Sequence, residues 1–92
     1  MLYMVRMTIT LPDDLDTDVR EQLVKAEKEY SQDLQRQGKI VGIWRVAGQY
    51  ANYCLFDAGS HDELHALVSG LPMYRYIHTE VEALAQHPNA VR

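Results

Sequence analysis

The chain has 92 residues, of which 47% are hydrophobic and 24% are charged, and its formal net charge is −4. A chain of this size forms one domain, residues 1–92, with a core so small that association with further copies is a sensible way to bury more surface. The acidic balance, without a basic cluster, argues against nucleic acid as the main partner.

The single cysteine, Cys54, excludes an internal disulfide framework and fits the reducing cytoplasm. No apolar run approaches the roughly 20 residues of a membrane span. The first residues are too polar and too regularly alternating for a signal peptide. We therefore expect a cytoplasmic protein with no membrane partner.

Residues 2–11 alternate between apolar and polar side chains, which predicts a strand that ends in a Pro-Asp-Asp turn. A long helix is expected over residues 17–37, with Asp16 or Thr17 as its cap and Gly38 closing it. This helix carries an apolar stripe that consists of Val19, Leu23, Ala26, Tyr30 and Leu34.

Two further strands are predicted over residues 39–47 and 50–57, joined by a tight turn that contains Gly48. Ser60 and Glu63 then have the spacing of a capping box, which opens a second helix.

The second helix ends at Gly70 and Pro72, and a last alternating strand is expected over residues 76–84. Residues 86–92 have no pattern, so they are expected either to be loose or to lie on another subunit. The order β-α-β-β-α-β predicts an α+β, ferredoxin-like fold with a four-stranded antiparallel sheet and two helices on one face. The other face needs cover, and we expect the chain to oligomerise through it.

Glu27 falls at the side of the apolar stripe, roughly 60° from its centre on a helical wheel. This position predicts a carboxylate that faces protein rather than water. Burial without a partner raises a carboxyl pKa, which suits a proton carrier near neutral pH. The other interpretation is a boundary glutamate paired with a lysine or an arginine.

Tyr50 and Asn52 are two residues apart, so they share one face of the expected strand with Cys54 and Phe56. A phenol and a carboxamide beside apolar side chains can line a small-molecule pocket. The alternative is that both satisfy neighbouring backbone groups.

Arg45 lies next to Trp44 near the turn, where a fixed cation can hold a carboxylate. A structural ion pair with a helix acid is an equally open interpretation. His61 and His65 have the spacing of metal ligands, but no third ligand accompanies them, so we expect both to face solvent and no metal to bind.

The residues alone therefore offer a base (Glu27), an anion anchor (Arg45) and two hydrogen-bond donors (Tyr50 and Asn52). This set is sufficient for proton transfer next to a carbonyl and insufficient to name a substrate.

Five segments cover nearly the whole chain: MLYMVRMTITLP, AEKEYSQDLQRQG, WRVAGQYANYCLFD, SHDELHALVSGLP and EVEALAQHP. Taken together, they resemble the muconolactone delta-isomerase family. The combination of WRxAGxYxN with the upstream EK and the closing HP is the specific part of this resemblance, since any one segment is a weak sign.

The resemblance implies a ferredoxin-like subunit in a homo-oligomer, typically a ring-based decamer. It implies a cofactor-free isomerase in the 3-oxoadipate pathway of aromatic compound degradation. There, muconolactone becomes 3-oxoadipate enol-lactone when a proton leaves the ring carbon bearing oxygen and returns nearer the carbonyl.

The base of the family matches Glu27, and its polar hairpin residues match Tyr50 and Asn52. Arg45 is expected to hold the carboxymethyl group of the substrate. The further substrate contacts that we predict are Trp44 and Tyr30.

Three residues depart from the family pattern. Gln49 stands where the family often has His, Arg75 replaces a proline, and His78 stands where a less basic residue is expected. If they line the pocket, the substrate is a substituted or different lactone. The alternatives are a chloromuconolactone dehalogenase, which uses the same base and expels chloride, and a non-catalytic ligand-binding or assembly protein on the same fold.

Overall fold

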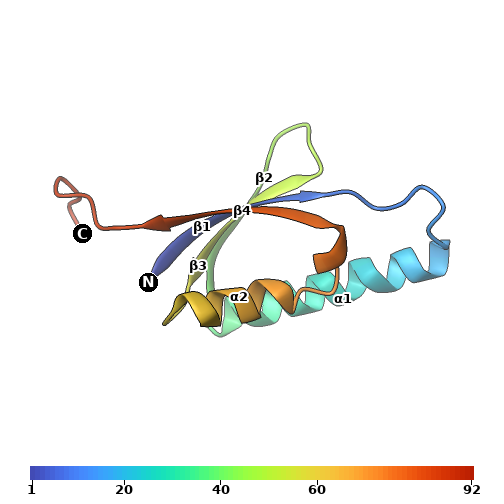
Figure 1. The fold of residues 1–92 in the computed structure, drawn as a ribbon, viewed down its shortest axis with the longest axis horizontal. Coiled ribbons are helices and arrows are strands. Elements are labelled where there is room, and N and C mark those ends of the chain that lie inside the picture. Colours follow the sequence, from blue (N-terminus) through green and yellow to red (C-terminus); the bar gives the residue numbers. More distant parts are fainter.

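A computed structural model describes all of residues 1–92 and contains four strands, two α-helices and one short 3-10 helix (Figure 1). The elements follow one another in the order β1 (Leu2–Ile9), α1 (Thr17–Arg36), β2 (Ile40–Arg45), β3 (Ala51–Asp57), α2 (His61–Ser69), η1 (Tyr74–Tyr76) and β4 (Ile77–Leu84). Each predicted helix and strand is present, with ends that differ from the expected ones by one or two residues. The 3-10 turn before β4 was not expected.

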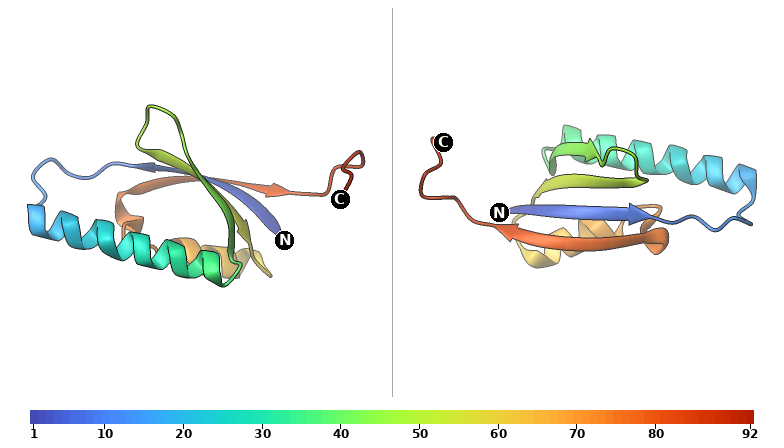
Figure 2. Two further views of the ribbon diagram at one scale, coloured as in Figure 1. Left: turned by 180° about the vertical axis from the view of Figure 1, so that it is seen from behind. Right: turned by 90° about the horizontal axis from the view of Figure 1, so that it is seen from above.

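The strands form one antiparallel sheet in the order β2-β3-β1-β4. Both helices lie on the same face of this sheet, as the two views in Figure 2 show. This arrangement confirms the predicted ferredoxin-like α+β fold. Neither helix combines the length and the apolar composition that a membrane-crossing segment requires.

The sheet face that meets the helices, here called the inner face, forms the core. Val5 of β1 lies opposite Cys54 of β3, and Tyr3 lies opposite Phe56, so alternate residues of both strands point toward the helices. The buried cluster consists of Tyr3, Val5, Met7, Leu34, Ile40, Cys54, Phe56, Ala58, Leu64, Val68 and Leu71. Its members come from both helices, from the residues on either side of α2 and from every strand except β4.

The opposite, outer face carries no helix. Met4 of β1 pairs with Leu55 of β3, and Arg6 pairs with Tyr53, whose ring lies 5.3 Å from the Arg6 guanidinium carbon. Trp44 pairs with Tyr53 on the β2 side of this face and is 53% exposed. The part of the outer face over β1, β3 and β2 is therefore rich in apolar side chains, several of them in contact with water, while β4 adds His78, Glu80 and Glu82 to this face.

Helix α1 begins and ends where the sequence predicts. The Asp16 carboxylate accepts hydrogen bonds from the N–H groups of Asp18 and Val19, and Gly38 takes a positive φ of 75° just after the helix. Burial nevertheless falls along the stripe, from Leu34 at 4% exposed to Val19 at 43%. The reason is visible in Figure 1, where the first half of α1 runs beyond the end of the sheet.

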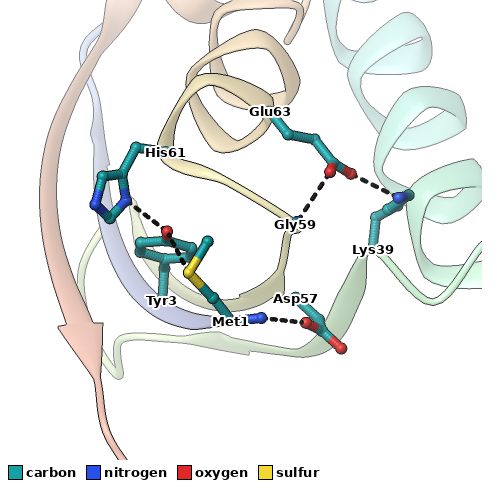
Figure 3. Close-up of polar contacts among 7 residues, drawn as sticks. All are labelled: Met1, Tyr3, Lys39, Asp57, Gly59, His61 and Glu63. Carbon is teal, nitrogen blue, oxygen red and sulfur yellow. Dashed lines mark hydrogen bonds and ion pairs between the residues drawn. The ribbon is translucent and has the colours of Figure 1, made fainter.

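A network of polar contacts fixes the start of α2 (Figure 3). The Ser60 hydroxyl accepts from the Glu63 N–H at 3.0 Å, and the Glu63 carboxylate accepts from the Gly59 N–H at 2.9 Å. The second Glu63 oxygen binds Lys39 Nζ at 2.6 Å, which lowers the pKa of this carboxyl. Ser60 is confirmed as the cap, and Glu63 reaches back to the N–H of Gly59, one residue before the cap. Glu63 also ties α2 to the residue that precedes β2.

His61 has a structural contact at the same end of the molecule. Its Nδ1 lies 2.6 Å from the hydroxyl of Tyr3, whose ring is buried in the core (Figure 3). The imidazole is exposed, as expected, but it also satisfies a buried phenol.

Candidate active site

Glu27 lies in the middle of α1, and its side chain is half-buried. One of its carboxylate oxygens, Oε1, accepts a hydrogen bond of 3.2 Å from the main-chain N–H of Met73. Loss of contact with water raises the pKa of this carboxyl above its ordinary value of 4.5, while the Met73 bond acts in the opposite, weaker sense. Its hydrogen bond goes to a neutral amide and it forms no ion pair, so Glu27 is not the salt-bridged boundary residue of the alternative interpretation.

Glu27 is close enough to the core to affect two other titratable groups. Burial and, secondarily, the negative charge of Glu27 raise the pKa of the Cys54 thiol in β3 to about 12. Burial and, secondarily, Glu27 also raise the pKa of Tyr30, one helical turn away. The printed contact of Glu27 itself is with the segment that follows α2, through the Met73 N–H.

Asn52 lies on this inner face, two residues before Cys54. It pairs with Met7 of β1 on one side and with Arg45 of β2 on the other. Its side chain is half-buried with its polar atoms still open to solvent, and no hydrogen bond within the chain involves its carboxamide, so it does not serve to satisfy neighbouring backbone groups. An amide in this state is available to a ligand.

Arg45 and Tyr50 lie on the inner face at the hairpin end. The Arg45 guanidinium carbon is 5.1 Å from the centroid of the Tyr50 ring, and none of the ion pairs of the chain involves Arg45. The predicted alternative, a pair with a helix acid, is not present. Tyr50 precedes β3 and is 42% exposed, and its carbonyl accepts from the Ile9 N–H, which continues the sheet pairing by one residue.

The turn between β2 and β3 sets these positions. Gly48 has a φ of 78°, and the Gln49 N–H donates to the Val46 carbonyl at 3.1 Å, which closes a tight turn. Beyond the turn, the outer-facing Arg6 donates to the Gln49 side chain at 2.9 Å. Gln49 is thus held by the outer face in the single chain.

Two predicted substrate contacts lie elsewhere or are otherwise engaged. Trp44 points to the outer face, opposite Tyr53, with its ring packed against Gly42, so it is not near Glu27 within one chain. The Tyr30 hydroxyl donates to the Leu67 carbonyl at 2.7 Å and so joins α1 to the last turn of α2. Tyr30 borders the site, but its polar group is already bonded.

Arg75 and His78, the other two residues that depart from the family pattern, are exposed on the surface. The Arg75 guanidinium carbon lies 5.4 Å from the centroid of the Tyr76 ring. His78 Nε2 lies 3.7 Å from Glu80 Oε1, and both side chains are exposed on β4. The segment that contains Arg75 contacts Glu27 through its main chain and not through the Arg75 side chain. It supplies the Met73 amide, which sequence reasoning missed because a main-chain donor has no residue-type signal.

A carboxylate with a raised pKa lies on α1, and a free carboxamide and an unpaired guanidinium lie on the sheet face that meets the helices. We call Glu27, Arg45, Tyr50 and Asn52 the inner-face site. The two hollows that the chain forms, of about 500 and 300 Å³, run along the flank of α1 and do not include these residues. No group of three side chains with metal-ligand chemistry comes together in the structure. A carboxylate, hydrogen-bond donors and a cation are the groups that proton transfer next to a carbonyl in an anionic substrate requires.

Comparison with known proteins points to the family that the sequence resembles. The family model described as muconolactone delta-isomerase matches residues 1–90. The chain is 51% identical to the muconolactone delta-isomerase of Acinetobacter baylyi, over 100% of this chain and 96% of that protein. It is 49% identical to the muconolactone delta-isomerase of Cupriavidus pinatubonensis, over 100% of both chains.

The fold is similar to a crystal structure of muconolactone isomerase, with a TM-score of 0.96 and 43% identity over 100% of this chain and 96% of that chain. Family model, curated relatives and solved structure agree over the full length. The chain therefore belongs to the muconolactone delta-isomerase family.

Proposed function

We propose that the chain, acting as one domain over residues 1–92, is an isomerase that converts muconolactone to 3-oxoadipate enol-lactone without a cofactor. The observation that carries this proposal is the environment of Glu27, whose carboxylate is half-buried and accepts its one hydrogen bond from a neutral main-chain amide. A base of this kind keeps enough proton affinity to take a proton from carbon and return it.

The reaction moves one proton and one double bond. The Glu27 carboxylate removes the proton from the ring carbon that bears the ring oxygen and the carboxymethyl group. The electron pair of that C–H bond moves into the ring, so that negative charge develops on the lactone carbonyl oxygen as a dienolate. Glu27 then returns the proton to the carbon next to the carbonyl, and the double bond moves to the position of the enol-lactone.

The other residues of the inner-face site have complementary roles. Asn52 donates a hydrogen bond from its free carboxamide N–H to the lactone carbonyl oxygen, where negative charge develops. Tyr50 supplies a second donor to the same oxygen. Arg45, which has no acidic partner in the chain, binds the carboxymethyl group of the substrate. The adjacent Tyr50 ring holds the guanidinium in place.

We further propose that the protein is a cytoplasmic homo-oligomer in which the outer faces of the sheets pack together. The outer face exposes Leu2, Trp44, Tyr53 and Leu84, each between 38% and 53%. Burial of such a surface between copies is favourable. The decamer typical of the family is the expected size. Within it, Trp44 and the tail at residues 86–92 contact a neighbouring copy.

The test is to incubate the purified protein with muconolactone and to follow the ultraviolet spectrum. Conversion to the enol-lactone is expected, and a spectrum unchanged by a folded protein would instead favour a non-catalytic binding or assembly protein. The 5-chloro compound is the second arm. Release of chloride from it, faster than isomerisation of muconolactone, would assign the chain to the dehalogenase alternative.

A further inference from the structure

The segment between α2 and β4 contacts Glu27 through its main chain. The Met73 N–H donates to Glu27 Oε1 at 3.2 Å, and this is the one hydrogen bond that the Glu27 side chain receives. The Met73 side chain is 2% exposed, so the residue is anchored in the core while its amide points at the carboxylate. The second carboxylate oxygen, Oε2, has no partner in the chain.

Contacts on both sides hold this amide in place. Before it, Leu71 is buried, and the Tyr30 hydroxyl joins α1 to the Leu67 carbonyl at 2.7 Å. After it, the Tyr76 N–H donates to the Met73 carbonyl at 2.8 Å, and the Tyr76 carbonyl accepts from Thr10 at 2.9 Å. The donor is therefore fixed relative both to α1 and to the sheet.

We propose that Met73 is a positioning residue whose main-chain N–H holds Glu27 Oε1 and leaves Oε2 as the oxygen that carries the proton. This inference rests on the proposed function for its catalytic meaning. The proton leaves one ring carbon and enters another, so the same oxygen has to reach both carbons without a change in the orientation of the carboxylate. The hydrogen bond from the Met73 N–H to Oε1 restricts rotation of the carboxylate and so keeps Oε2 in one orientation.

The choice of donor also suits a base. A lysine or an arginine in the same place would lower the pKa of Glu27 much more strongly than a neutral amide. Tyr30 on α1 and Cys54 on β3 are the two titratable groups whose pKa values the charge of Glu27 helps to raise, and both are uncharged near neutral pH. Arg45, on the same sheet face, forms no ion pair with Glu27. The amide is thus the direct contact that favours the ionised form.

The test replaces the Met73 amide by an ester, which removes the N–H and keeps the side chain. The chain has a single cysteine, Cys54, so a synthetic segment 54–92 that contains the α-hydroxy analogue of methionine can be ligated to segment 1–53. The matched control is the same ester at Tyr74, whose N–H donates to the Leu71 carbonyl at 2.9 Å and does not touch Glu27. Both chains are refolded and assembled in full, and circular dichroism establishes their fold.

Two readouts are measured for each chain: the NMR titration of the ¹³C-labelled Glu27 carboxyl and the pH profile of kcat/KM with muconolactone. Removal of the Met73 N–H is expected to raise the midpoint of the Glu27 titration by about one pH unit, with the acid limb of kcat/KM moving equally. The plateau of kcat/KM falls by about tenfold. The Tyr74 ester moves the midpoint by less than about 0.3 unit.

An unchanged Glu27 midpoint in the Met73 ester, or an equal shift in the Tyr74 ester, would overturn the proposal. If the unmodified protein does not convert muconolactone, the proposed function fails, while the NMR titration still decides whether the amide holds the carboxylate.

A measurement on the unmodified chain covers the case in which the ester does not fold. The ¹⁵N-labelled Met73 N–H resonance is expected to move with pH at the same midpoint as the Glu27 carboxyl, and Glu27→Gln is expected to abolish that movement. A Met73 resonance that ignores the Glu27 titration would contradict the contact.

Discussion

Half-burial of the Glu27 carboxyl affects the stability of the chain as well as its chemistry. Its folded pKa is raised above the ordinary value of 4.5, so the folded chain binds this proton more tightly than the unfolded chain. Stability from this group is therefore present below pH 4.5 and is lost as the pH rises through the raised folded value. The ionised carboxylate, which the proposed reaction needs as its base, is the form that folding disfavours.

The first prediction follows from this sign. Glu27→Gln removes the charge and keeps an oxygen that can accept the Met73 N–H, so its melting temperature is expected to exceed that of the natural chain at pH 8. The two should converge near pH 4. Thermal melts followed by circular dichroism measure this difference. Glu29→Gln, at an exposed position of the same helix, is the control and should show no such pH dependence.

A lower melting temperature for Glu27→Gln at pH 8 would contradict the first prediction. That result would mean that the ionised carboxylate gains more from its contacts than it loses through burial.

Asn52 provides the second prediction. Asn52→Ala removes a donor to the charge that develops in the reaction, so kcat should fall by about 100-fold, with a smaller change in KM. Its carboxamide makes no hydrogen bond in the chain, so the melting temperature should change little. Steady-state kinetics and a thermal melt on the same sample check both parts. An unchanged kcat would show that Asn52 is not a donor in the reaction, and a variant that unfolds would show that Asn52 has a structural role.

At the scale of elements, local signals predicted α1 and α2 well because their ends depend on nearby residues. Asp16 and Gly38 fix the ends of α1, and Ser60 with Glu63 fixes the start of α2. The exposure of Val19 was not predictable in the same way. The stripe of a helix shows which side is apolar, and only the length of the sheet beneath it decides how much of that side is covered.

The site residues divide along similar lines. Glu27 was placed correctly because its neighbours on the helical wheel are apolar. Trp44 and Arg45 were both predicted as substrate contacts, although adjacent residues in a strand point to opposite faces. Strand geometry alone therefore allows only one of them to share a face with Asn52, and the structure places Arg45 there. The Met73 amide was not predictable, since any residue carries the same main-chain donor.

The connection between the two helices gives the third prediction. A Cβ added at Gly70 would lie 2.6 Å from the Tyr30 hydroxyl and 3.1 Å from the Ala66 carbonyl. Gly70→Ala is therefore expected to lower the free energy of unfolding by about 1–2 kcal/mol, as measured by urea denaturation. The hydroxyl is held by the Leu67 carbonyl, so it cannot simply move away.

A double-mutant cycle tests the cause of that loss. In a Tyr30→Phe background the closest contact is absent, so Gly70→Ala should cost less there than in the natural chain. Equal costs in the two backgrounds would assign the loss to the Ala66 carbonyl or to the end of the helix instead.

For the whole molecule, the outer face of the sheet determines assembly in our proposal. Leu55 lies at the centre of that face, between Met4 on β1 and Gly42 on β2. Leu55→Glu introduces a charge that would be buried without a partner between two copies, which strongly disfavours their contact. Light scattering coupled to size-exclusion chromatography should show a multiple of the subunit mass for the natural chain and a lower mass for the variant.

Ala66→Glu, at an exposed position of α2, adds the same charge away from the outer face and should leave the mass unchanged. A natural chain that elutes as a monomer, or a Leu55→Glu variant with unchanged mass, would exclude the outer face as the interface.

The turnover of muconolactone by Glu27→Gln, compared with that of the natural chain, tests the central claim most directly. Loss of the base should lower kcat by at least about 1,000-fold, while circular dichroism and the mass in solution show the same fold and assembly. Near-full turnover by the folded, assembled variant would contradict the account, because the proton would then have another carrier.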